Sequence, residues 1–176
     1  LPAEATKVIV NFVYGSEGKV IDTIRAERMV SGFYGKTATG LTEWVADMPN
    51  LKKADYCFSN CQNLTTFIGD LSSLQYGDKM FYYCEALETF IGDLSSLVNG
   101  NRMFNGKLNA ESVECILESI PTYTSGTHNL GLIIHVDAVE TFNEITGAGL
   151  LPSNGERLED VSYKGWTINV VVSNAD

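Results

Sequence analysis

FSNCQNLTTFIGDLSSL, residues 58–74, decides the fold because the chain contains it twice. It returns 23 residues later as FYYCEALETFIGDLSSL, residues 81–97. A weaker copy lies at residues 41–51, and the start of another lies at Met103-Phe104-Asn-Gly. A fixed period of this length is the signature of a chain that turns through similar short segments.

Apolar residues fall mostly at every third position within each copy, at Phe58, Cys61, Leu64, Phe67, Leu71 and Leu74 in the first. Neither a helix nor an alternating strand gives this spacing, whereas a coil of short strands and turns does. One coil cannot bury its apolar edge alone, so the copies are expected to stack. This predicts that Leu64, Phe67, Leu87 and Phe90 are fully buried. A period of 23 residues lies within the range of leucine-rich repeats.

The pattern F-x-x-C-x-x-L-x-x-F/I-x-x-x-L-x-x-L over residues 38–104 resembles the BspA-like leucine-rich repeats of bacterial surface proteins. The segment from Lys107 to Val172 is similar to a module that follows such repeats in proteins of gut Bacteroidetes and their phages. The resemblance implies a secreted, extracellular protein that mediates adhesion on a cell surface or a virion. The chain departs from the family in its small number of repeats.

The expected fold is therefore α/β: a short leucine-rich-repeat solenoid of 23-residue repeats over residues 35–104. An N-terminal β-hairpin cap over residues 1–34 and an α/β C-terminal cap over residues 105–176 complete one domain, residues 1–176. The hairpin is expected from residues 7–14 and 19–24, joined by the turn Gly15-Ser-Glu-Gly18. Solenoid ends need such a polar covering.

After Phe104 the sequence pattern changes from the 23-residue repeat to one that predicts helices and strands. A helix is expected after Asn109, which can cap it, and Pro121 ends it. A buried strand over residues 130–136 follows, and Asp137 with Glu140 forms a capping pattern for a second helix, which the glycines at 147 and 149 stop. Residues 166–172 predict the last strand. The strand–helix–strand order suggests that these elements extend the solenoid sheet in parallel.

Composition excludes several classes of protein. The 176 residues carry a formal net charge of -10, so nucleic acid is an unfavourable partner. No apolar run is long enough to span a bilayer, so no membrane insertion by this chain is expected. The opening Leu1-Pro2-Ala3 lacks the features of a signal peptide, and a leader is expected to lie outside this sequence.

A search for reactive groups favours structural roles. Cys61 and Cys84 share one repeat position and are expected to be buried thiols, with a disulfide as the alternative, whereas Cys115 is expected to be exposed. His135 lies in a strand, and no nucleophile motif or phosphate loop accompanies it. Asp70 and Asp93 are expected to bind turn backbone. The chain is therefore expected not to be an enzyme and to need no metal or cofactor.

The copies differ most beside the apolar positions, where their side chains should point to solvent. Small polar groups bordered by tyrosines suit a sugar chain or an extended protein surface. The expected function is thus binding of a host protein or glycan; a structural spacer or assembly module of a larger surface or tail protein is the alternative. The expected binding residues are Thr65, Thr66, Tyr82, Tyr83, Glu85, Glu88 and Thr89.

Overall fold

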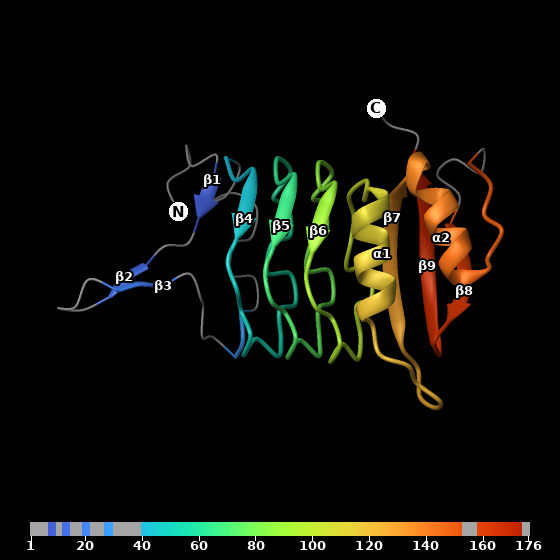
Figure 1. The fold of residues 1–176 in the computed structure, drawn as a ribbon, viewed down its shortest axis with the longest axis horizontal. Coiled ribbons are helices and arrows are strands. Elements are labelled where there is room, and N and C mark those ends of the chain that lie inside the picture. The colour runs from blue at the N-terminus through green and yellow to red at the C-terminus, as the bar shows by residue number, and fades with distance from the viewer. Residues whose placement is uncertain are drawn as a thin grey trace.

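The computed structural model describes residues 7–9, 12–14, 19–21, 27–29, 40–152 and 158–173. These form a small α/β fold, drawn in Figure 1, with a parallel sheet, a mixed sheet, a separate hairpin and two α-helices. The parallel sheet has the order β1 (Lys7–Ile9), β4 (Glu43–Val45), β5 (Thr66–Ile68), β6 (Thr89–Ile91). The mixed sheet has the order β7 (Asn129–His135), β9 (Trp166–Ser173), β8 (Leu158–Tyr163). The hairpin is β2 (Phe12–Tyr14) with β3 (Lys19–Ile21), and the helices are α1 (Ala110–Ser119) and α2 (Val139–Thr146).

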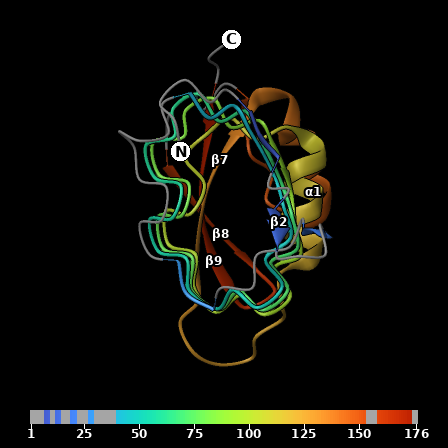
Figure 2. The ribbon, with the colours of Figure 1, turned by 90° about the vertical axis from the view of Figure 1, so that its left-hand side faces the viewer.

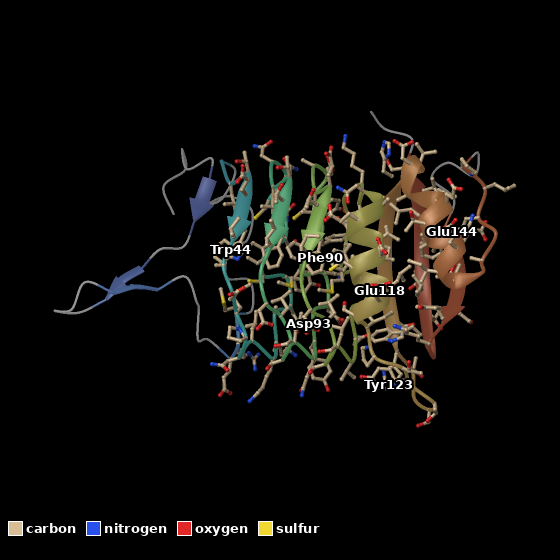
Figure 3. The ribbon with its side chains drawn as sticks, in the orientation of Figure 1. Trp44, Phe90, Asp93, Glu118, Tyr123 and Glu144 are labelled. Atoms are coloured by element: carbon tan, nitrogen blue, oxygen red, sulfur yellow. The ribbon has the colours of Figure 1, made fainter. Side chains whose placement is uncertain are left out.

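The 23-residue period of the sequence sets the register of the parallel strands. Trp44 of β4 pairs with Phe67 of β5, and Phe67 pairs with Phe90 of β6. Each strand has three residues, and only its middle side chain is buried. Trp44 and Phe90 lie among the core side chains in Figure 3.

Two rows of phenyl rings fill the space behind these strands. Phe58, Phe81 and Phe104 stack with their centroids 5.4 and 5.5 Å apart, and Phe67 stacks on Phe90 at 5.4 Å. Rings of the two rows meet edge to face, a geometry that aromatic pairs prefer. The prediction that Leu64, Phe67, Leu87 and Phe90 are buried is confirmed, since each has 0% exposure.

Helix α1 closes the free edge of β6. Asn109 caps the helix by accepting a hydrogen bond from the Ser112 N–H, as expected. The buried Ser112 hydroxyl accepts a hydrogen bond of 2.8 Å from the N–H of Phe90, and so takes the place of a neighbouring strand. Both helices lie on one side of the molecule, as Figure 2 shows. Strands β7 and β9 and the stop of α2 at Gly147, which has a φ of 73°, confirm the elements expected there.

The fold class expected from the sequence, a leucine-rich-repeat solenoid with two caps, is wrong. A leucine-rich repeat places alternate strand residues inside, whereas each short strand here contributes a single core residue. Among the strands, only β4, β5 and β6 follow the 23-residue register, with isolated bridges of the same spacing at Lys53, Tyr76 and Asn99 and at Phe81 and Phe104. The mixed sheet and both helices make up the rest of a small α/β fold. The 23-residue period therefore describes a smaller part of the structure than the sequence predicted.

The expected N-terminal hairpin is confirmed in its pairing, since β2 runs antiparallel to β3, but its place as the cap of the parallel sheet is wrong. The strand expected over residues 7–14 divides into β1, which pairs with β4, and β2, which pairs with β3 in a sheet of its own. The hairpin therefore stands apart from the parallel sheet, as Figure 1 shows, and β1 lies at the edge that the hairpin was expected to cover.

Three expectations for the C-terminal part need correction. The mixed sheet is separate from the parallel sheet, and β8, which the sequence did not predict, runs antiparallel to β9. Asp137 does not cap the second helix; it lies inside a 3-10 turn, Val136–Ala138, which the His135 side chain caps. Cys115 is half-buried rather than exposed, because its thiol approaches the carbonyl of Gly92 at 3.5 Å.

Candidate binding groove

An apolar row crosses the outward face of the mixed sheet. Ile133 of β7 lies opposite Val171 of β9, and Val171 lies opposite Leu158 of β8. Side chains alternate along a strand, so the residues that flank Val171, Val170 and Val172, are buried on the other face. Leu158 is 59% exposed, which is high for a leucine. The row is therefore an apolar strip that spans all three strands and faces solvent.

This face continues onto the chain next to β7. The N–H of Phe104 donates to the Gly131 carbonyl at 3.0 Å, and the N–H of Ile133 donates to the Phe104 carbonyl at 3.2 Å. A Cβ on Gly131 would lie 2.5 Å from the Cα of Arg102, so only glycine lets the two backbones approach this closely. Residues 102–107 thus lie beside the apolar row.

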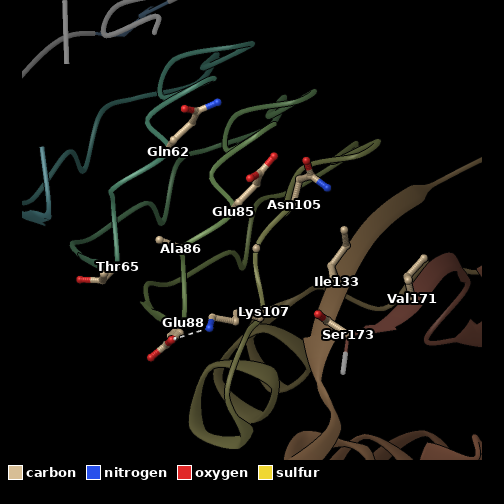
Figure 4. Close-up of a pocket in the computed structure, with 11 residues that line it drawn as sticks. Gln62, Thr65, Glu85, Ala86, Glu88, Asn105, Lys107, Ile133, Val171 and Ser173 are labelled. Atoms are coloured by element: carbon tan, nitrogen blue, oxygen red, sulfur yellow. Dashed lines mark ion pairs between the residues drawn. The ribbon is translucent and has the colours of Figure 1, made fainter. Parts of the chain in front are cut away.

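A groove of about 700 Å³ opens between this row and the turns before β5 and β6. Figure 4 shows Gln62, Glu85 and Asn105 following one another on successive turns of the chain, with Ile133 and Val171 continuing the line on the neighbouring strands. The remaining lining residues complete the floor and the far end: Thr65, Ala86, Glu88, Gly106, Lys107 and Ser173. The groove combines amides, hydroxyls, carboxylates and an apolar strip, a mixture typical of recognition sites.

The polar side chains of the groove are held by short contacts. Glu88 forms an ion pair of 3.4 Å with Lys107, drawn as a dashed line in Figure 4. The Thr65 hydroxyl donates to the Thr42 carbonyl at 3.0 Å. The Asn105 side-chain oxygen accepts from the Tyr83 N–H at 2.9 Å, which fixes its amide group. These contacts restrict the orientations of Thr65, Glu88 and Asn105.

A second hollow of about 370 Å³ continues the groove past Asn105. The two hollows share Asn105, Ile133 and Val171, so they form one surface. The second adds a distinct set of polar side chains, Tyr82, Asn101, Arg102 and Asn169, and the apolar Leu158. We call the joint surface of both hollows the binding groove.

The binding groove contains four of the seven residues that the sequence singled out. Thr65, Glu85 and Glu88 line the larger hollow, and Tyr82 lines the smaller one. Tyr83 lines neither, although its ring packs against Tyr82 with centroids 4.1 Å apart.

The remaining two, Thr66 and Thr89, lie opposite each other in β5 and β6, outside the groove. Thr65 and Glu88, the chain neighbours of Thr66 and Thr89, do line the groove, so the expected binding residues do not all share one surface, because adjacent residues of an extended chain point to opposite faces.

Sequence reasoning missed the half of the groove that comes from the mixed sheet. Its apolar row needs the pairing of β8 with β9, and β8 was not predicted. One feature of the sequence could have predicted part of this half. In a strand over residues 166–173 side chains alternate between the two faces, so Val171 points to solvent if Val170 and Val172 point into the core. Nothing in the local sequence marks Arg102 or Asn105, because their place follows from the bridge between Phe104 and the β7 backbone.

Other candidate residues have structural roles. Asp70 and Asp93 each accept a hydrogen bond of 2.7 Å from a serine N–H two residues on, which confirms the expected role in turns. His135 pairs with Asp137 at 3.4 Å. The Cys84 thiol is buried and donates to the Phe58 carbonyl at 3.0 Å.

The pKa of the Cys84 thiol is raised, mainly by its hydrogen bond with the Cys61 side chain and then by its burial, so the thiol stays protonated. Both cysteines are free thiols within the core. Within the described part of the chain, no group of three or more His, Cys, Asp or Glu residues could hold a metal ion.

Comparison of the chain with protein-family models, curated proteins and solved structures gave no match in any of the three. The resemblance to bacterial surface repeats consequently rests on the repeated motif alone. Neither helix of the described residues has the length and apolar character needed to cross a bilayer.

Proposed function

We propose that this chain is a non-catalytic binding module whose groove holds an extended segment of a host protein or glycan. The observation that carries the proposal is the joining of an apolar row, Ile133–Val171–Leu158, to a wall of amide, hydroxyl and carboxylate groups. Exposed apolar groups next to ordered polar groups are the usual composition of a recognition surface.

The shape of the groove favours an extended ligand. Its wall residues Gln62 and Glu85 occupy equivalent positions of neighbouring copies, which are spaced by about 5 Å, as in a sheet. A polymer lying across the copies meets similar groups in sequence, and no reactive side chain is needed to hold it. The expected setting, a cell surface or virion, is part of the proposal and rests on the motif resemblance.

The test measures binding by variants of the groove. The chain is screened against an array of glycans and host matrix proteins, and any ligand found is titrated by calorimetry. Ile133→Thr with Val171→Thr removes the apolar row and keeps β-branched side chains suited to strands. Tyr82→Ala with Glu85→Ala removes polar wall groups. Each pair is expected to weaken binding at least tenfold with a nearly unchanged melting temperature.

Thr66→Ala is the matched control, because Thr66 belongs to the residues first expected to bind but lies outside the groove. Its affinity should equal that of the unchanged chain. Loss of binding in Thr66→Ala, with full binding by the groove variants, would place the site on the β5–β6 face instead. Absence of any saturable ligand would favour the alternative, a spacer or assembly module.

A further inference from the structure

One position of the 23-residue period has an unusual backbone. Tyr56, Lys79 and Arg102 are spaced by 23 residues and have φ values of 57°, 54° and 50°. This left-handed region costs an L-residue about 1–2 kcal/mol, and glycine or asparagine normally occupies it. Three large side chains in one column of such positions are therefore unexpected on grounds of stability.

A neighbouring position shows how the same backbone is usually filled. Asn60 has a φ of 64°, in keeping with the preference of asparagine for this region. In the next copy the equivalent residue is Tyr83, with a φ of 58°. Strained backbone of this kind is commonly retained where the side chain has a use.

The side chains of the column form an aromatic and cationic patch. The Lys79 ammonium donates to the Tyr56 hydroxyl at 2.8 Å and lies 5.1 Å from the centre of that ring. It also lies 5.7 Å from the ring of Tyr82, which packs against Tyr83. Tyr82 and Arg102 both line the smaller hollow of the groove, so the column leads into it.

The cations of the described residues fall into two groups: some pair with a carboxylate of these residues, whereas Lys79, Arg102, Arg28 and Lys164 do not, and Lys164 donates instead to the carbonyls of Leu117, Glu118 and Ile120. Lys52, Lys53 and Lys107 each pair with a carboxylate. Within the described residues, Lys79 and Arg102 form no ion pair. The chain has 22 acidic and 12 basic residues, so acidic partners are abundant elsewhere. Lys79 and Arg102 are neighbours, and neither is in direct contact with a carboxylate of the described residues, although the charge of Asp78 lies near Lys79; the pair is thus suited to an anion from outside.

The smaller hollow supplies the groups that sugars require. Asn101, Asn105 and Asn169 place three amides around it, and an amide both donates to and accepts from hydroxyl groups. The guanidinium of an arginine matches a carboxylate or sulfate with two parallel bonds. Asn169 lies in β9, and Asn101, Arg102 and Asn105 lie in the segment that hydrogen-bonds to the edge of β7, so the hollow lies across backbone that is already paired. An extended peptide, in contrast, binds best by adding to a free edge.

We propose that the ligand class of the binding groove is an acidic glycan, whose carboxylate or sulfate groups lie against Lys79 and Arg102. This inference rests on the proposed function and narrows it to one class of polymer. The tyrosines contact the apolar faces of the sugar rings, and the asparagines of the hollow bind their hydroxyls.

The experiment is calorimetry of the full chain with polygalacturonate and heparin as probes. Fully methyl-esterified polygalacturonate is the matched ligand, because esterification removes the charge and keeps the sugar chain. Polyglutamate tests for a general preference for polyanions. At least one of the two acidic glycans should bind. The methyl ester should bind at least tenfold more weakly, and the affinity for the acidic glycan should fall as the salt concentration rises from about 0.05 to about 0.5 M.

Lys79→Asn and Arg102→Asn should each weaken this binding at least tenfold without lowering the melting temperature, because asparagine suits the left-handed backbone. Lys52→Asn removes the same charge outside the column, from a pair with Glu27, and should bind normally. Unchanged affinity in both column variants would overturn the inference.

Equal binding of the ester, or polyglutamate binding as tightly as the glycans, would also overturn the inference. Binding of only a neutral glycan or a protein at the groove would leave the proposed function standing and reject the acidic ligand. No ligand in either screen would reject both.

Discussion

Replacing Arg102 with glycine should stabilise the protein, although it removes a whole side chain. Arg102 has a φ of 50°, and it forms no ion pair within the described residues. Relief of the left-handed strain contributes about 1–2 kcal/mol. The greater freedom of glycine in the unfolded chain removes about 0.5–1 kcal/mol of that gain. From the central values of the two effects, the expected net gain in the free energy of unfolding is about 0.75 kcal/mol.

The assay is urea denaturation followed by tryptophan fluorescence, since Trp44 and Trp166 are buried. With an m-value of about 2 kcal/mol/M, the midpoint should rise by about 0.4 M. Gln75→Gly is the control, because Gln75 is exposed and does not have a positive φ. It should lose about 0.5–1 kcal/mol. If Arg102→Gly destabilised the protein as much as Gln75→Gly, the argument from backbone strain would be refuted.

Leu87→Ala should lower the free energy of unfolding by about 2–5 kcal/mol, measured in urea, because it leaves a cavity in a fully buried site; a loss below about 1 kcal/mol would contradict this. Cys115 should react first of the four cysteines with a thiol reagent, and faster at alkaline pH, since burial raises the pKa of its thiol; mass mapping identifies the labelled residue. Burial, and then the charge of Asp55, raises the pKa of Asp78 above 3.8. The ionised carboxylate therefore lowers the free energy of unfolding as the pH rises through that pKa. Asp78→Asn removes this charge and should raise the free energy of unfolding by less than about 1 kcal/mol at neutral pH, and the difference from the unchanged chain should disappear toward pH 3.8. A gain that grows as the pH falls would reverse the sign of this argument.

Local chemistry predicted much of the core and several elements. A residue such as Leu87 or Phe90 is buried wherever an apolar position repeats at a fixed period, because the copies can bury it only against one another. The cap of α1 at Asn109 and its stop before Pro121 depend on neighbouring residues alone, and both were predicted. These features need no knowledge of which strands meet.

The parts that failed depend on pairing between distant segments. Strand β8 consists of alternating exposed and half-buried residues, so its sequence has no apolar face that predicts a strand. The division of residues 7–14 between two sheets follows from the pairing of β1 with β4. The fold class was wrong for the same reason: a period found in residues 58–97 was extended to a chain in which the hairpin and the mixed sheet pair in other ways.

The column of Tyr56, Lys79 and Arg102 shows why the site was only partly visible in the sequence. In the sequence these positions differ from copy to copy, which is typical of an ordinary solvent-exposed face. The backbone shows instead that all three share a left-handed conformation that their side chains disfavour. If only stability mattered, glycine or asparagine would be expected at these positions. Solubility does not explain the cations either, because a chain of net charge -10 does not need lysine or arginine side chains without carboxylate partners for its solubility. The proposed acidic ligand would account for both departures, because it needs cationic side chains beside aromatic rings, as at Lys79 and Arg102. The proposal of an acidic ligand therefore draws on backbone conformation and on the absence of ion pairs, neither of which can be seen in the residue types.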